Sequence, residues 1–139
     1  MIGVDTNIWV RYFTRDDPKQ SPMAKRFLDA SCSAETPAWM SVIVLCELTW
    51  ALRKSYRYSR AEIGGVIRKL LDSPEIVVEN SNAVEEALEA YSGTNVGFSD
   101  CLIGRLNIHN SVAKTFTFDA RAARLDGFEL LQIETIPEK

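Results

Sequence analysis

The chain has 139 residues, of which 46% are hydrophobic and 25% are charged, and its formal net charge is −3. This length and hydrophobic content predict one globular domain over residues 1–139, while the slight acidity argues against nucleic-acid binding by the whole surface and allows only a local basic patch. The longest apolar runs are too short to span a membrane and the start lacks a signal-peptide pattern, so we expect no membrane association.

The first predicted element is a short apolar strand over residues 1–4, which Asp5 ends. Thr6 and Asn7 follow, and the apolar and aromatic run at 8–13 predicts a helix. An acid between a strand and the next helix lies at the carboxyl end of the strand, where sites form in open α/β sheets. Asp5 is therefore a candidate site residue, although Asp is also a common N-cap.

A second helix is predicted to begin at Ser21 and Pro22, and a third follows a brief strand at 37–40 and begins at Ser41. On the third helix, the residues three and four positions from Glu47 are all apolar: Ile43, Val44, Trp50 and Ala51. We therefore expect Glu47 on the helix face that packs into the core. A charge there must be protonated, paired with a base or bound to a cation, unless the side chain reaches solvent at the rim.

The third helix ends in a stretch that alternates cations with Tyr56 and Tyr58. The cations are Arg53, Lys54, Arg57 and Arg60. Cations are favourable at a helix C-terminus whatever the function. The stretch is explained equally well as a surface that contacts phosphates and stacks on bases.

The rest of the chain alternates between helices and strands. Helices are predicted to begin at residues 59, 82 and 98, and strands at 75–79, 112–118 and 128–136. Ser59 and Glu62 form a predicted capping box, Asp100 lies in the first turn of the helix from 98, and Asp119 follows the strand at 112–118. This alternation predicts an α/β fold with a parallel sheet and helices on both of its faces.

The three cysteines are separated in sequence and form no CxxC motif. Cys32, Cys46 and Cys101 are also not grouped with the only histidine, His109. This pattern argues against a disulfide framework and against a zinc site, and it favours a reducing, cytoplasmic location.

Four acids, Asp5, Glu47, Asp100 and Asp119, are expected to lie near one cleft. Asp5 and Asp119 end parallel strands at the same edge, and Asp100 begins a helix there. Two bare carboxylates about 4 Å apart repel by roughly 4 kcal/mol at an effective dielectric constant near 20, so the cluster needs bound cations or raised pKa values. Oxygen ligands alone select Mg²⁺ or Mn²⁺, and the matching chemistry is metal-assisted displacement at phosphorus.

Four stretches carry a family resemblance: residues 4–7 (VDTN), 47–52 (ELTWAL), 98–103 (FSDCLI) and 117–119 (TFD). In their order and spacing the chain resembles PIN-domain ribonucleases, and more narrowly the VapC-type toxins of toxin–antitoxin pairs. The resemblance implies a five-stranded parallel sheet in the order 3-2-1-4-5. It also implies Mg²⁺- or Mn²⁺-dependent endonucleolytic cleavage of RNA that leaves a 5′-phosphate and a 3′-hydroxyl.

By motif position, the implied catalytic and metal-binding residues are Asp5, Glu47, Asp100 and Asp119. Thr6 and Thr117 would order carboxylates or water, and Asn7 would brace the first loop. Many relatives carry another Asp three residues before the Asp100 position, where this chain has Gly97, so a second metal ion would have one ligand fewer. The resemblance further implies a homodimer and a cognate antitoxin that crosses the cleft, with residues 8–13 and 50–58 as candidate contact surfaces.

Other functions fit parts of the sequence. A phosphatase of the haloacid dehalogenase type would use Asp5 as its nucleophile, but that class has a second Asp where this chain has Asn7. A receiver domain needs an acidic pair after its first strand and a Lys after a late strand, where this chain has Asp119. The remaining alternative is a PIN-fold binding module that has lost catalysis, and metal binding separates it from an active nuclease.

Overall fold

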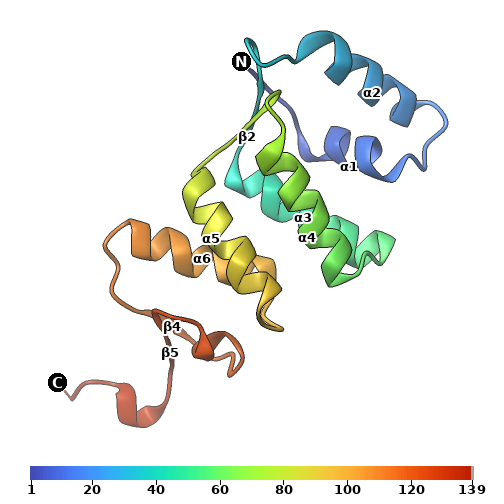
Figure 1. Ribbon diagram of the computed structural model, residues 1–139. Helices are drawn as coiled ribbons and strands as arrows, with labels where there is room; N and C mark the ends of the chain where they lie inside the picture. Colours follow the sequence, from blue (N-terminus) through green and yellow to red (C-terminus); the bar gives the residue numbers. More distant parts are fainter. Residues whose placement is uncertain (139) are drawn as a thin grey trace. The chain divides into compact units, whose positions relative to one another are not determined.

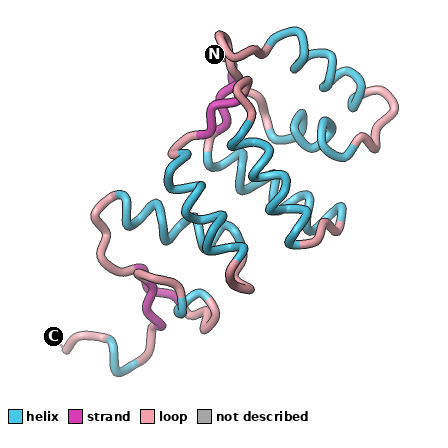
Figure 2. Tube along the Cα trace, viewed as in Figure 1, coloured by secondary structure: helices cyan, strands magenta, loops and turns pink. Residues whose placement is uncertain are grey.

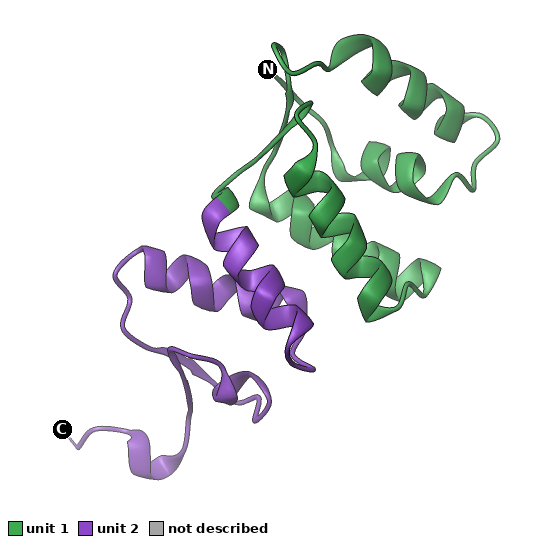
Figure 3. Ribbon diagram, viewed as in Figure 1, with its two compact units in different colours: residues 1–81 green, residues 82–139 purple. Residues whose placement is uncertain are grey.

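The computed structural model describes residues 1–138, and in this range it contains six α-helices and five short β-strands, all paired in parallel (Figure 2). The chain divides into two compact units, residues 1–81 and 82–139 (Figure 3). Parallel strands connected by helices make this an α/β protein, as the sequence predicts.

The first unit is built on a three-stranded sheet in the order β1-β2-β3. Its strands are β1 (Ile2–Gly3), β2 (Ala38–Met40) and β3 (Ile76–Val78). Ala38 and Met40 are completely buried, whereas Trp39 between them is exposed. Because successive side chains of a strand point to opposite faces, β2 has one face in the core and the other at the surface.

Four helices complete the first unit (Figure 1): α1 (Thr6–Thr14), α2 (Gln20–Ser31), α3 (Val42–Tyr56) and α4 (Arg60–Asp72). The predicted caps of two of them are confirmed, since Ser41 accepts a hydrogen bond from the N–H of Val44 and Ser59 forms the capping box with Glu62. The predicted start of α2 at Ser21 is wrong. The helix begins at Gln20, and Asp17 accepts hydrogen bonds from the N–H groups of Lys19 and Gln20.

The second unit contains α5 (Ser81–Ser92), α6 (Phe98–His109) and the parallel pair β4 (Thr115–Thr117) and β5 (Phe128–Leu130). Its core includes Tyr91 and Phe98, whose rings meet edge to face at 5.9 Å between centroids. The last predicted strand is shorter than expected, because residues 133–135 form a 3₁₀ turn.

The expected five-stranded sheet in the order 3-2-1-4-5 is not observed. The strands form one sheet of three and one of two, and no pairing of β1 with β4 occurs among residues 1–138. The neighbours within each sheet, 3-2-1 and 4-5, agree with the expected order. β1 has only two paired residues, so it offers few backbone hydrogen bonds to a further strand.

An ion-pair cluster joins the two helices of the second unit. Glu86 of α5 accepts a hydrogen bond from Nε of Arg105 at 2.7 Å and lies 2.9 Å from Nε2 of His109. The hydrogen bond with His109 and the nearby Arg105 guanidinium hold the pKa of Glu86 below its usual value, against a smaller effect of burial. A lowered carboxyl pKa stabilises the fold above the ordinary Glu pKa, and this contribution disappears as the pH falls through the lowered value.

We therefore expect Glu86→Gln to lower the stability of the second unit at neutral pH by less than about 1 kcal/mol and to reduce its sensitivity to acid. Hydrogen exchange of the α5 and α6 amides at pH 7 and at lower pH measures both effects. Glu89→Gln, on the exposed side of the same helix, is the matched control and should behave like the parent. Equal acid sensitivity of Glu86→Gln and the parent would contradict this assignment.

Candidate active site

In the first unit, Thr6 donates hydrogen bonds to both Asp5 and Glu47. Asp5 follows β1 and caps α1, and its Oδ1 accepts a hydrogen bond from the N–H of Thr6 at 2.7 Å. The hydroxyl of Thr6 donates a hydrogen bond to Oε1 of Glu47 on α3, also at 2.7 Å. The Glu47 carboxylate is thus held beside the turn that follows β1.

The expectation that Glu47 faces the core is wrong. Glu47 is exposed, and its neighbours Ile43 and Trp50 are 70% and 63% exposed. α3 buries another side, formed by Leu45, Leu48, Thr49 and Leu52. Because the helix is apolar almost all the way round, its periodicity did not distinguish these faces. The stripe of leucines at spacings of three and four residues was the better signal.

In the second unit, Asp100 and Asp119 are close enough to influence each other. Asp100 lies in the first turn of α6 and is half-buried. Burial, and secondarily the negative charge of Asp119, raise the pKa of Asp100 above its usual value. Oδ1 of Asp119 accepts hydrogen bonds from the N–H groups of Arg121 and Ala122, so Asp119 is fixed at the end of β4.

The remaining predicted ordering residues lie next to these acids. The hydroxyl of Thr117 accepts a hydrogen bond from the N–H of Asp119 at 3.0 Å, which shapes the turn that carries this carboxylate. Asn7 is exposed in the first turn of α1, and its side chain makes no hydrogen bond within the described part of the chain.

None of the four acids is neutralised by a cation. In residues 1–138, no Lys, Arg or His forms an ion pair with Asp5, Glu47, Asp100 or Asp119. Hydrogen bonds engage a single oxygen of Asp5, of Glu47 and of Asp119, and none engages Asp100. Carboxylate oxygens therefore remain available as ligands, and oxygen donors without nitrogen or sulfur suit Mg²⁺ or Mn²⁺.

The grouping of all four acids into one site stays a prediction, because Asp5 and Glu47 belong to one unit and Asp100 and Asp119 to the other. The described residues contain no group of three or more His, Cys, Asp and Glu side chains that could hold a metal ion. Each unit instead contributes a pair, Asp5 with Glu47 through Thr6, and Asp100 with Asp119. A pair of carboxylates is compatible with Mg²⁺, which keeps several water ligands and is completed by phosphate oxygens of a substrate.

The cationic stretch at the end of α3 is exposed at Arg53, Lys54 and Arg57, whereas Arg60 begins α4 and is half-buried. The two tyrosines between these cations face α1. Tyr56 receives a hydrogen bond from Arg11 at 3.3 Å, and the hydroxyl of Tyr58 donates one to the carbonyl of Phe13 at 3.4 Å. Burial raises the pKa of Tyr58. The hydroxyls of both tyrosines are therefore engaged with α1, and both side chains are half-buried.

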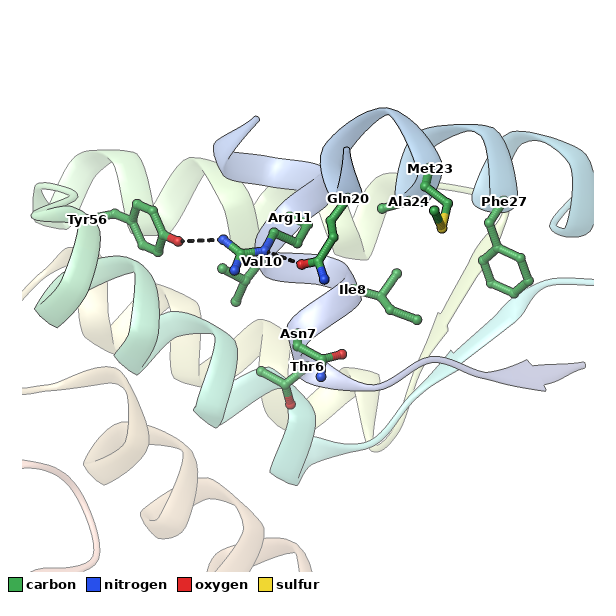
Figure 4. Close-up of a pocket in the computed structure, with 10 residues that line it drawn as sticks. All are labelled: Thr6, Asn7, Ile8, Val10, Arg11, Gln20, Met23, Ala24, Phe27 and Tyr56. Carbon is green, nitrogen blue, oxygen red and sulfur yellow. Dashed lines mark hydrogen bonds between the residues drawn. The ribbon is translucent and has the colours of Figure 1, made fainter. Parts of the chain in front are cut away.

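A cavity of about 690 Å³ lies between α1 and α2, next to Thr6 (Figure 4). Its lining residues are Thr6, Asn7, Ile8, Val10, Arg11, Gln20, Met23, Ala24, Phe27 and Tyr56. Arg11 closes one end through hydrogen bonds to Gln20 and Tyr56. The sequence indicated residues 8–13 as a contact surface but missed the contribution of α2. Met23 and Phe27, exposed four residues apart on one side of α2, were the available signal.

In a comparison with protein families, residues 2–128 match the family model of the PIN domain. No curated protein matches the chain. Within residues 1–138, none of the helices has the length and apolar character required to cross a membrane.

Proposed function

Because this chain belongs to the PIN-domain family, whose members are generally metal-dependent nucleases, we propose that it is an endoribonuclease that requires Mg²⁺ or Mn²⁺. We further propose that it is the toxin of a toxin–antitoxin pair, that it acts in the cytoplasm as a homodimer, and that residues 1–139 work as one PIN domain. The apolar lining of the cavity between α1 and α2 supports a surface that binds an antitoxin.

We propose Asp5, Glu47, Asp100 and Asp119 as the residues that hold the metal ion. The observation that carries this proposal is that none of these acids has a cationic partner in the described chain, while each keeps an unused carboxylate oxygen. A bound divalent ion would lower the pKa of a water molecule and neutralise charge on the scissile phosphate.

The other residues of the site position these carboxylates. Thr6 orients Glu47 through its hydroxyl, and Thr117 shapes the turn that presents Asp119. Asn7, beside Thr6 at the cavity, is proposed to brace the first loop against the RNA.

The direct test is cleavage of a mixed-sequence RNA by the purified protein with Mg²⁺ and with EDTA. We expect cleavage with Mg²⁺ that EDTA abolishes, and products that carry a 5′-phosphate and can therefore be ligated. Cleavage in EDTA would contradict the metal requirement. Saturable Mn²⁺ binding by calorimetry without cleavage of any RNA would show instead a binding module that has lost catalysis.

We expect Thr6→Val to lower kcat for RNA cleavage by about 10- to 100-fold, as is typical when a group that orients a metal ligand is removed. KM should change little, because Thr6 acts through Glu47 rather than on the RNA backbone. Thr6→Ser keeps the hydroxyl and should recover most of the rate. Thr14→Val, which removes a hydroxyl at the other end of α1, is the control; a Thr6→Val enzyme as fast as this control would exclude the orienting role.

A further inference from the structure

One side of α3 carries four exposed residues in a row, which we call the α3 row: Glu47, Trp50, Lys54 and Arg57. Spacings of three and four residues place Glu47, Trp50 and Lys54 above one another on the helix surface, and Arg57 follows as the C-cap of α3. The row begins at the proposed metal ligand, continues with an indole one turn later, and ends in cations roughly 10–15 Å further along the helix.

Trp50 is the unusual member of the row. Its side chain is 63% exposed, whereas Trp9 of α1 is 1% exposed and packs against other rings. Within residues 1–138, no aromatic ring or cation contacts Trp50. Because Tyr56 and Tyr58 are engaged with α1, Trp50 is the aromatic residue of this region that is open to a flat ligand.

The cations of the row are also unpaired. Lys54 and Arg57 form no ion pair in the described chain. Arg57 ends α3 with a positive φ of 56°, a conformation that favours Gly at helix ends.

We propose that Trp50 stacks on an unpaired base of the RNA substrate, next to the nucleotide whose phosphate is cleaved, while Lys54 and Arg57 contact phosphates further along the strand. This inference rests on the proposed nuclease function. Base stacking on an aromatic side chain combined with phosphate contacts is how proteins hold single-stranded RNA. An anionic strand fits the row better than an apolar protein surface does, because two of its four residues are unpaired cations.

The test measures binding of fluorescein-labelled single-stranded RNA by anisotropy in EDTA, where no cleavage is expected. Trp50→Ala should weaken binding about 5- to 150-fold, and Trp50→Phe, which keeps a ring, should recover most of the affinity. The loss should be larger for an adenine-rich than for a uracil-rich strand, because purines stack more strongly. Ile43→Ala, on the same side of α3 one turn before Glu47 and 70% exposed, is the matched control and should bind like the parent.

Salt dependence separates stacking from charge. Trp50→Ala should leave the slope of log K against log salt unchanged, whereas Lys54→Gln and Arg57→Gly should each reduce it by about 0.7, the value for one phosphate of a single strand. Gly readily adopts the positive φ of Arg57, so we expect Arg57→Gly to keep the fold of this helix end. Arg26→Gln, an exposed arginine on α2, should leave the slope unchanged.

Equal RNA affinity of Trp50→Ala and the parent would overturn the inference. A change in self-association, measured by sedimentation, would also overturn the inference if Trp50→Ala and Ile43→Ala shared it and neither lost RNA affinity. The row would then be a protein interface. RNA binding that depends on Trp50, in a parent that cleaves no RNA with Mg²⁺, would overturn the proposed nuclease function and leave the stacking role standing. If the parent cleaves RNA with Mg²⁺ and Trp50→Ala binds RNA as tightly as the parent, the stacking role is overturned and the proposed nuclease function stands.

Discussion

Asp100→Asn is expected to lower RNA cleavage by at least about 100-fold, while making the metal-free protein more stable. Removing even a group that positions a metal ligand typically costs 10- to 100-fold in activity, and Asp100 is proposed as a ligand itself. Asparagine keeps the shape of the side chain but loses the charge that would attract the cation. Cleavage rates with Mg²⁺ and Mn²⁺ calorimetry measure the functional part of this prediction.

The stability gain follows from the direction of the pKa shift. Burial and the charge of Asp119 raise the pKa of Asp100 in the folded state, so the folded state binds its proton more tightly than the unfolded state. The folded state therefore loses stability as the pH rises from the ordinary Asp value through the raised pKa, and the loss is complete above it. Asparagine avoids this loss at neutral pH and brings no benefit in acid below the ordinary pKa.

Urea unfolding in EDTA at neutral and at acidic pH tests the predicted difference in stability between Asp100→Asn and the parent. Asp100→Asn should exceed the parent in stability at neutral pH, and the two should converge in acid. Asp126→Asn removes an acid of the same unit whose side chain is 92% exposed, and it should retain the cleavage rate of the parent. An Asp100→Asn protein that cleaves RNA normally would remove Asp100 from the site. One that is less stable at neutral pH would contradict the burial argument.

Gly104→Ala is expected to destabilise the second unit by about 1–3 kcal/mol, the usual cost of overpacking. Gly104 is buried in α6, and a Cβ at this position would clash with Cε2 of the Phe128 ring on β5 and lie 3.2 Å from its Cδ2 and Cζ. The ring would have to move, and with it the contact between α6 and β5.

The matched control is Gly65→Ala on α4, where a Cβ meets nothing within 4 Å. There the better helix propensity of Ala should stabilise the protein by roughly 0.5–1 kcal/mol. Phe128→Leu, which shortens the clashing side chain, should reduce the cost of Gly104→Ala in the double variant. Hydrogen exchange of the α6 amides measures each effect. Equal stabilisation by Ala at both glycines would show that Gly104 is not in close contact with Phe128.

Local features of the structure could be predicted from the sequence, because they depend on neighbouring residues. The caps at Ser41 and at Ser59 with Glu62 are confirmed, since each joins a side chain to a backbone group within three residues. The same holds for Asp5 and Asp119, which follow short strands and bind the N–H groups of the next turn. These turns place both acids at strand ends whatever the packing of distant elements.

Features that depend on distant contacts could not be predicted in this way. Which side of α3 is buried is decided by packing against α1 and α4, so Glu47 and Trp50 are exposed although their neighbours are apolar. The hydrogen bond between Thr6 and Glu47 spans 41 residues, and the contacts of Tyr56 and Tyr58 with α1 span a similar distance along the chain.

The sequence by itself determined the α/β class, the family to which the chain belongs and the position of each acid on its own strand or helix, because periodicity, caps and motifs are local. Only the tertiary structure decided that the strands form sheets of three and two, that Glu47 is held by Thr6, and that Trp50 rather than a tyrosine is exposed beside it. These features depend on which of several equally apolar surfaces is buried. Tertiary packing determines this, and the local sequence pattern does not.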